Sequence, residues 1–599
     1  MAAGLGCLAL LSACGGSEPA RPSILLVTLD TTRADRLGCY GRADAGTPHL
    51  DALAARGLVA ERALAPVPLT LPSHTTLLTG LEPPVHGVRD NGLSAVPDAA
   101  VTLAEELSAA GLRSAAFVSA YPLSATFGLD QGFEVYDDRF GAATTGDAPG
   151  AMHERKGDAT VDRALTWLDT LGDDEPFFAW VHLFDPHYPL LAPEPFASRF
   201  RDDPYQAEVA FADAQVGRLA DWLERRGRTD RTLVVVTADH GEGLGDHGEV
   251  SHGNLLYDTT QHVPLILAGP EVEPGVRMAG SLGLSDVAAT LRVYGGAAAG
   301  ASASGRGEPL PLDGSPVERT VYLETLYPRI HFGWSELFGI ERSGWKYVEA
   351  PGAAGGSGAS GAGELWPVGE EASGPGQAES ERARALASEL ATLRDELEAR
   401  ALTADAAEAD LAALEALGYV GVDVSFDGEA EDGITPGLDP RRVIHANTAG
   451  NLLRSALGLG DLEAAELQLA TVRELDPGGL LDLESTGFLE LARGLRAPGG
   501  GRDDAALGRA LASFQAATSQ APGRRGLWQK LAEVHLALDE PEPAFLAATH
   551  AARLAPPPES LVQLVATLRG RLESDLTAAR TRGDGAAVAR LEELLTKER

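Results

Sequence analysis

Apolar stretches of strand length alternate with helical patterns along the first half of the chain, and this alternation constrains the fold most. The stretch Ser23–Leu29 has no polar alternation and ends at Asp30, as expected for a strand buried on both faces of a parallel sheet. Further stretches of this kind occupy 114–118, 177–183, 232–237 and 263–268, with helical patterns at 47–56, 162–171 and 205–226. We therefore expect an α/β fold with a doubly wound sheet, whose functional groups follow the carboxyl ends of the strands.

Composition divides the rest of the chain. Short strands expected at 320–324 and 344–348 add a small antiparallel appendage, so the first domain spans residues 22–350. Residues 351–440 are rich in Gly, Ala, Ser and acidic residues, which predicts a linker that contains a helix. Residues 441–599 are rich in Ala and Leu and predict a helical domain.

Proline spacing within the helical domain indicates a repeat. Helix-ending signals recur at Pro477, Pro522 and Pro556. The last two are 34 residues apart, the period of tetratricopeptide repeats, and the first two are 45 apart, which fits one repeat with an 11-residue insertion near residues 497–504. We expect tetratricopeptide-like repeats that offer a surface to a protein partner, with an unrelated helical bundle as the alternative.

The net charge of −38 excludes one class of partner. Nucleic-acid binding needs clustered Lys and Arg to neutralise phosphates, and here the acidic excess falls on the first domain and the linker. Residues 1–350 carry −21, residues 351–440 carry −15 and residues 441–599 carry −2. No apolar run approaches the 18 residues of a transmembrane helix.

The amino terminus resembles a lipoprotein signal. Residues 1–14 form a short apolar segment that ends Leu11-Ser12-Ala13-Cys14, and residues 15–21 form a Gly-containing tether. This pattern predicts lipidation of Cys14, and an exported protein held by that lipid in the bacterial envelope, in the periplasm or at the outer membrane. No Lys or Arg precedes the apolar segment, so a plain signal peptide and a buried first element stay open as alternatives.

Polar residues that follow two of the expected strands predict a metal site. Asp30 ends the first strand, and Asp239 and His240 follow the strand at 232–237. Carboxylate oxygens suit hard divalent cations, and imidazole adds affinity for zinc or manganese. These three side chains are therefore expected to share one divalent metal: Ca²⁺, Mg²⁺, Mn²⁺ or Zn²⁺.

Thr70 lies where a helix is expected to begin. Pro72 suits the first turn of a helix, which places Thr70 at its amino terminus. The unpaired N–H groups there favour an anion, so Thr70 is either a nucleophile or an N-cap. Arg89 either binds an anion or pairs with Asp90. His182 alternates within a buried strand and is expected to be structural, and His247 is either a ligand or a loop-stabilising residue.

Together these segments resemble the sulfatase family of the alkaline phosphatase superfamily. The resemblance rests on LVTLDTTRADRLGCYG, TPHLDALAARG, TLPSHTTLLTG with HGVRDN, FDPHYP and TADHGEGLGDHG, in this order. It implies an alkaline-phosphatase-like fold and a metal-dependent hydrolase of anionic sulfate or phosphate esters. By position it makes Asp30, Asp239 and His240 metal ligands and Thr70 the nucleophile, with Asn91, His187 and His252 at the transferring group.

Several positions depart from the family pattern. Typical sulfatases carry Cys or Ser where Thr70 stands, and oxidise it to formylglycine, an aldehyde that threonine cannot yield. Thr31 stands at the usual second aspartate and stays a candidate metal ligand. His74 stands at the arginine that usually ends the nucleophile motif and stays a candidate substrate-binding residue, and His252 stands at a lysine. The expected Lys–His pair is missing at 118–120.

Thr70 instead resembles the threonine nucleophile of phosphodiesterase, phosphotransferase and lipoteichoic-acid-synthase branches of the superfamily. We therefore expect direct attack by Thr70, with phosphoester cleavage favoured. Two alternatives remain: a catalytically degenerate scaffold that acts through its helical repeats, and an envelope phosphotransferase.

Overall fold

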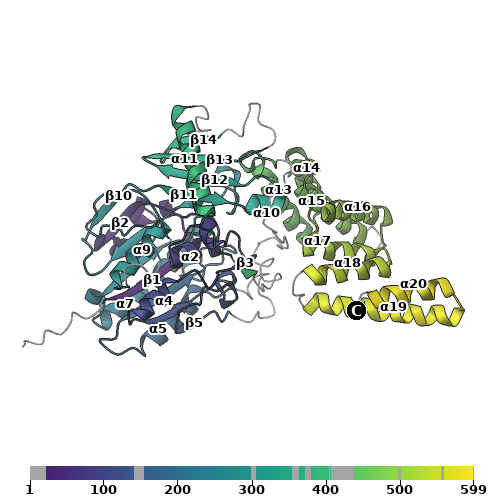
Figure 1. The fold of residues 1–599 in the computed structure, drawn as a ribbon, viewed down its shortest axis with the longest axis horizontal. Helices are drawn as coiled ribbons and strands as arrows, with labels where there is room; N and C mark the ends of the chain where they lie inside the picture. Colours follow the sequence, from purple (N-terminus) through teal and green to yellow (C-terminus); the bar gives the residue numbers. More distant parts are fainter. Residues whose placement is uncertain are drawn as a thin grey trace, which may run out of the picture.

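The computed structural model describes residues 22–140, 154–297, 305–353, 363–371, 380–403, 405–406, 437–496, 501–554 and 559–597. Figure 1 shows a domain of sheets and helices beside a region made only of helices. The predicted signal peptide, Cys14 and the tether lie outside the described residues. Among the helices that are described, none is both long enough and apolar enough to cross a membrane.

The central sheet confirms the predicted α/β class. Its strand order is β10-β2-β9-β7-β1-β6-β4-β5, with β8 paired to β2. The strands are β1 (Ser23–Leu29), β2 (Leu58–Leu64), β4 (Arg113–Phe117), β5 (Val135–Asp137), β6 (Phe177–Leu183), β7 (Thr232–Thr237), β8 (His262–Val263), β9 (Leu265–Ala268) and β10 (Val276–Gly283). The neighbours β7, β1, β6, β4 and β5 run parallel, so their carboxyl ends share one edge.

One expected strand differs from its prediction. The stretch 263–268 divides at Pro264, and β9 runs antiparallel to both β7 and β2. The connection from β7 to β9 runs from residue 238 to 264 and holds the short helices η6 (Asp246–Gly248) and α8 (Asp258–Gln261) and the strand β8. It is long enough for a crossover, but it holds no long helix to carry the chain back along the sheet for a parallel return.

Helices cover both faces of the sheet, which explains the unbroken apolar strands. Along β1, Ile24 and Leu26 pack into one core cluster, and Leu25 and Val27 pack into another. The first cluster includes residues of α2 (Thr70–Thr79), α4 (Leu103–Ala109) and α9 (Leu284–Tyr294). The second includes residues of α1 (Pro48–Ala55), α5 (Gly157–Leu168) and α7 (Pro204–Arg225).

The antiparallel appendage is present and extends beyond residue 350. Its sheet joins β11 (Val321–Thr325), β12 (Leu337–Arg342), β13 (Trp345–Glu349) and β14 (Glu364–Pro367) in that order. Helix α11 (Glu381–Glu398) packs against it through Leu390 and Leu397. Helix α11 lies in the segment 351–440, where the sequence predicts a helix within a linker, and its leucines recur three and four residues apart along one face. Strand β14 lies in the same segment and was not predicted.

The carboxy-terminal region is helical, as predicted. Its helices are α13 (Pro440–Leu459), α14 (Leu462–Leu475), α15 (Leu480–Leu495), α16 (Asp504–Gln520), α17 (Arg525–Ala537), α18 (Pro541–Leu554), α19 (Glu559–Arg582) and α20 (Gly585–Lys597). They pack as consecutive pairs (Figure 1). Helices α14 and α16 end just before Pro477 and Pro522, whereas Pro556 lies outside the described residues. The tetratricopeptide identity of these pairs stays a prediction.

A hydrophobic cluster, here called the junction cluster, joins the two parts. It contains Val67 and Leu69 of the sheet domain, the aromatic residues Tyr327, Phe332 and Trp334, and the helical-region residues Val443, Ala446, Ala449, Val472 and Leu481. The indole nitrogen of Trp334 donates to Asp476 Oδ1 at 3.2 Å. The Arg524 guanidinium donates to the main-chain carbonyl of His331 at 3.3 Å. The helical region is therefore packed onto the sheet domain.

We expect Trp334→Ala to loosen the junction. Removing this fully buried ring should cost about 3–5 kcal/mol, because it leaves a cavity and an unsatisfied Asp476 carboxylate. Small-angle scattering should show an increased radius of gyration, and limited proteolysis should become faster near residues 437–440. Trp528→Ala, in α17 and outside the junction cluster, is the matched control; equal changes in both variants would contradict a stabilising junction.

Candidate active site

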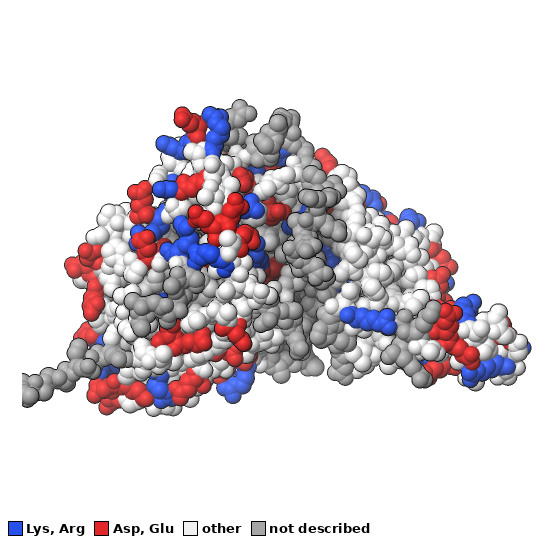
Figure 2. Space-filling view, viewed as in Figure 1, with Lys and Arg blue, Asp and Glu red and all other residues white. Residues whose placement is uncertain are grey.

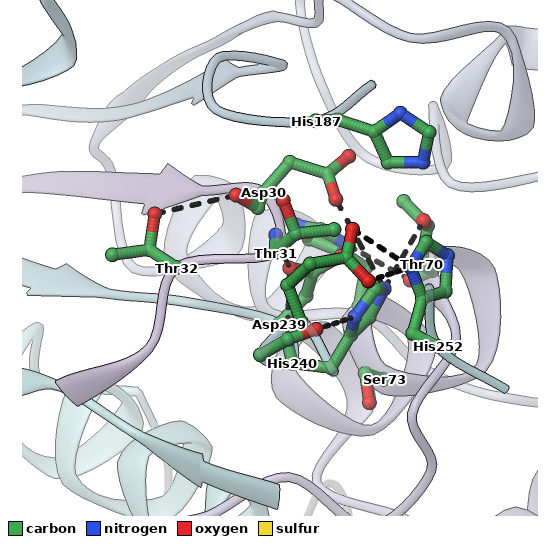
Figure 3. Close-up of polar contacts among 12 residues, drawn as sticks. Asp30, Thr31, Thr32, Thr70, Ser73, His187, Asp239, His240 and His252 are labelled. Carbon is green, nitrogen blue, oxygen red and sulfur yellow. Dashed lines mark hydrogen bonds and ion pairs between the residues drawn. The ribbon is translucent and has the colours of Figure 1, made fainter. Parts of the chain in front are cut away.

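The predicted site residues meet at the shared carboxyl edge of β7, β1 and β6. Asp30 follows β1, Asp239 and His240 follow β7, and His187 follows β6. Thr70 approaches the same point from the amino terminus of α2 (Figure 3). Parallel neighbouring strands thus bring together residues separated by more than two hundred positions, as expected for this class of sheet.

Asp30, Asp239 and His240 form a compact buried cluster. One ligand atom of each lies within 4.8 Å of the others, and all three side chains are fully buried. His240 Nε2 lies 3.5 Å from Asp239 Oδ2 and 3.9 Å from Asp30 Oδ1. The Nδ1–H of His240 donates to the Gly241 carbonyl at 2.9 Å, which leaves a lone pair on Nε2 directed at the carboxylates.

This cluster is chemically incomplete without a positive charge. Asp30 Oδ1 and Asp239 Oδ2 have no hydrogen-bond donor among the described residues. The pKa of both carboxyls is raised to about 7, mainly by burial and, for Asp239, also by the charge of Asp30. Two buried carboxylates and one imidazole lone pair suit a divalent cation. The residues therefore fit the metal that the sequence predicts.

Thr31 occupies a strained turn beside this cluster. Its φ angle is 50°, and its N–H donates to Asp239 Oδ1 at 3.2 Å. The Tyr205 hydroxyl donates to the Thr31 carbonyl at 2.6 Å and holds the turn. Thr31 Oγ1 is buried without a hydrogen-bond partner among the described residues. A neutral hydroxyl thus stands where a second carboxylate would add charge.

Thr70 begins α2 and faces the cluster. Its Oγ1 lies 3.5 Å from His240 Nε2. Asn91 Oδ1 accepts the Leu71 N–H at 2.8 Å, which anchors the first turn of the helix. Asn91 Nδ2 is buried and has no acceptor in the described part of the chain. An anion bound at Thr70 would therefore meet both a helix amino terminus and an amide donor.

His74 is buried between Thr70 and the cluster, with Nδ1 3.5 Å from Asp239 Oδ2, and its role in substrate binding stays a prediction. Its Nδ1–H donates to the Thr70 carbonyl at 2.8 Å, and its Nε2 accepts from the Thr28 hydroxyl at 3.1 Å. Trp180 in turn donates to Thr28 at 3.0 Å. Since the ring is fully buried within this chain of hydrogen bonds, His74 positions the main chain of Thr70.

His187 and His252 flank the cluster on its open side (Figure 3). Their ring centroids are 5.2 Å apart, and the His252 ring lies 4.4 Å from that of His240. His187 Nδ1–H donates to the Tyr188 carbonyl at 2.6 Å, which directs Nε2 away from the backbone. Burial lowers the pKa of both imidazoles to about 3. An anion bound beside these two imidazoles would raise their pKa again, because it favours the protonated form.

Arg89 and His247, whose roles were left open by the sequence, make their contacts outside the Asp30–Asp239–His240 cluster. The Arg89 guanidinium pairs with Glu324 at 2.5 Å and Glu398 at 3.0 Å, so the structure corrects its predicted role in binding substrate. Two acidic partners far along the chain were not visible in the sequence. His247 stacks on Tyr257 with ring centroids 4.0 Å apart, which is the loop-stabilising alternative.

Glu242 was not predicted as a site residue, and His182 was predicted to be structural, but both lie beside the cluster. Glu242 Oε1 lies 3.2 Å from His252 Nδ1, and burial raises the Glu242 pKa to about 7. His182 Nδ1 accepts the Ser119 N–H at 3.3 Å, which leaves Nε2 protonated and 3.3 Å from Asp30 Oδ2. The position of Glu242, two residues after His240, was the available signal. For His182 the signal was its place next to β1 in the sheet.

Comparison with known proteins finds similarities within the sheet domain. Residues 22–293 match the family model named Sulfatase. The chain is 27% identical over 315 residues to the ulvan-active sulfatase of Formosa agariphila, covering 46% of this chain and 61% of that protein. It is 29% identical over 279 residues to human arylsulfatase A, covering 39% and 54%. The chain thus spans less than two thirds of these relatives.

Solved structures share the fold. The carrahexaose complex of Ps i-CgsB aligns with a TM-score of 0.53 at 19% identity, over 64% of this chain and 94% of that chain. The phosphonate monoester hydrolase of Agrobacterium radiobacter aligns with a TM-score of 0.50 at 21% identity, over 63% and 96%. The fold is therefore alkaline-phosphatase-like, as predicted.

We expect Asp239→Asn to stabilise the metal-free protein at pH 8 and to abolish stabilisation by Mn²⁺. With the Asp239 pKa raised from 3.8 to about 7, the metal-free folded state holds a proton that the unfolded state releases. Stability therefore falls as pH rises from 4 to 7, and the asparagine removes that loss. Thermal unfolding at pH 5 and pH 8, with and without Mn²⁺, measures both effects.

The exposed Asp174→Asn is the matched control for this charge change, because its partner Arg231 lies on the surface. It should leave the metal response intact. Retained Mn²⁺ stabilisation in Asp239→Asn would contradict the proposed ligand set.

Proposed function

We propose that the chain is a metal-dependent hydrolase of the sulfatase family that cleaves sulfate or phosphate esters, with Thr70 as the direct nucleophile. The observation that carries this proposal is the Thr70 hydroxyl, 3.5 Å from the imidazole of the Asp30–Asp239–His240 cluster. Because threonine cannot become formylglycine, phosphoester cleavage is favoured over the usual sulfatase chemistry.

The reaction has two displacements at the transferring atom. Thr70 Oγ1 attacks phosphorus or sulfur, the bond to the ester oxygen breaks, and the alcohol leaves. Water then attacks the same atom and releases phosphate or sulfate from Thr70. Asn91 Nδ2, which is buried without an acceptor among the described residues, would donate to an equatorial oxygen.

The metal ligands of this chain would be Asp30, Asp239 and His240, with the Thr31 hydroxyl beside them. When bound there, a divalent cation lowers the pKa of the threonine hydroxyl and neutralises charge on the transferring group. His187 lines the cavity beside the cluster, and in its protonated form its Nε2–H would donate to the leaving alcohol. Glu242 fixes the orientation of His252 through Nδ1.

The cellular setting is part of the proposal. The signal-like segment that ends at Cys14 supports export and attachment to the bacterial envelope through a lipid. The paired helices offer a surface for a protein partner.

Thr70→Ala should lower kcat by about a thousandfold or more, because no other hydroxyl replaces the nucleophile. The measurement uses aryl phosphate, phosphodiester and aryl sulfate substrates with added Mn²⁺, Zn²⁺, Ca²⁺ or Mg²⁺. Mass spectrometry of the Thr70 peptide after rapid acid quenching should find a phosphate or sulfate adduct in the wild type.

Ser73→Ala is the matched control, since Ser73 lies one turn along the same helix and its hydroxyl donates to the Val67 carbonyl at 2.6 Å (Figure 3). Its kcat should stay near the wild-type value. Undiminished activity of Thr70→Ala would exclude Thr70 as the nucleophile.

A further inference from the structure

The pocket at the candidate active site has an unusual lining for a protein that handles anions. A cavity of about 560 Å³ opens beside His187, His252 and Glu242. No Lys or Arg lines it in the part of the chain that the structure describes. Most other lining residues are aliphatic or aromatic: Leu69, Tyr188, Leu190, Tyr205, Leu244, Val250 and Tyr327.

The mouth of this cavity is apolar as well. The Tyr188 side chain is 71% exposed and Val250 is 53% exposed. Large apolar side chains left in water around a functional cavity indicate a surface that a ligand covers. The cavity volume lies in the range of sites that bury a compact organic molecule.

One wall comes from the helical region. Asn451 of α13 lines the cavity, although it follows the nucleophile by 381 positions in sequence. Its Oδ1 accepts from Arg454 at 2.6 Å, and its Nδ2 donates to Asn447 at 2.9 Å. Because a guanidinium can only donate, these two bonds fix the orientation of the Asn451 amide. One amide hydrogen and one lone pair remain for a ligand.

We propose, on the basis of the hydrolase function above, that the substrate is an ester of an uncharged, largely apolar ring-containing alcohol, and that Asn451 is a specificity-determining residue for it. The ester group lies at Thr70, and the alcohol fills the cavity between the apolar side chains and Asn451. A second anionic group on the alcohol would be desolvated with no Lys or Arg to pair with among the described residues that line the cavity. The net charge of −38, whose acidic side chains spread over the sheet domain in Figure 2, adds long-range repulsion.

The proposed preference for an uncharged alcohol is tested with two aryl esters on the full-length protein in the presence of Mn²⁺. The 4-acetylphenyl and 4-carboxyphenyl esters differ mainly in one charge. We expect kcat/KM to be about tenfold or more lower for the carboxylate, at constant ionic strength. Equal or higher kcat/KM for the carboxylate would overturn the proposal.

The role of Asn451 is tested by filling the cavity from α13. Asn451→Trp should lower kcat/KM for a 2-naphthyl ester by about tenfold, mainly through KM, because the indole occupies the alcohol site. Leu452→Trp places the same ring one residue along, at an exposed position that does not line the cavity, and should stay within about twofold of wild type. Equal KM changes in the two variants would overturn the assignment.

Binding of free 2-naphthol separates this inference from the proposed function. If the wild type hydrolyses no ester with any metal, the proposed function fails, yet calorimetry still tests the cavity. Weaker naphthol binding in Asn451→Trp, with unchanged binding in Leu452→Trp, supports the cavity assignment. The absence of naphthol binding to the wild type overturns it. Thermal unfolding of both variants checks that they fold.

Discussion

The burial of two carboxylates beside an imidazole lone pair is the constraint on which the site depends. Asp30 and Asp239 reach one another because β1 and β7 are parallel neighbours that end together. Neither carboxylate is neutralised by a Lys or Arg side chain among the described residues, and burial is the largest cause of the raised pKa of both. The surrounding hydrogen bonds serve this arrangement: Gly241 fixes the tautomer of His240, and Thr31 holds Asp239 from the main chain.

Much of the fold could be predicted from local pattern. The strands β1, β6 and β7 have the bounds that their apolar runs indicate, because burial on both faces leaves a signal that needs no partner information. The direction of β9 could not be predicted, since it depends on how the chain returns across the sheet. Strand β14 could not be predicted either, because it lies inside a segment whose average composition resembles a linker.

The candidate site also contains residues whose roles could be predicted from the sequence and residues whose roles could not. Asp30, Asp239, His240 and Thr70 could be proposed because each follows or begins an element that the sequence marks. The contacts of His74 and Arg89 could not be predicted, because each depends on a partner distant in sequence. His74 reaches Thr28 across 46 positions, and Arg89 reaches Glu324 across 235. The direction of these side chains is set by partners that become neighbours only in the folded core.

The junction cluster also has a mechanical consequence. Val67 and Leu69 immediately precede Thr70, and they pack in the same cluster as Val443 and Ala446 of α13. A displacement of the helical region is therefore transmitted to Thr70 through a short length of main chain. Anything that shifts α13 would shift the start of α2 as well, without contact to the Asp30–Asp239–His240 cluster.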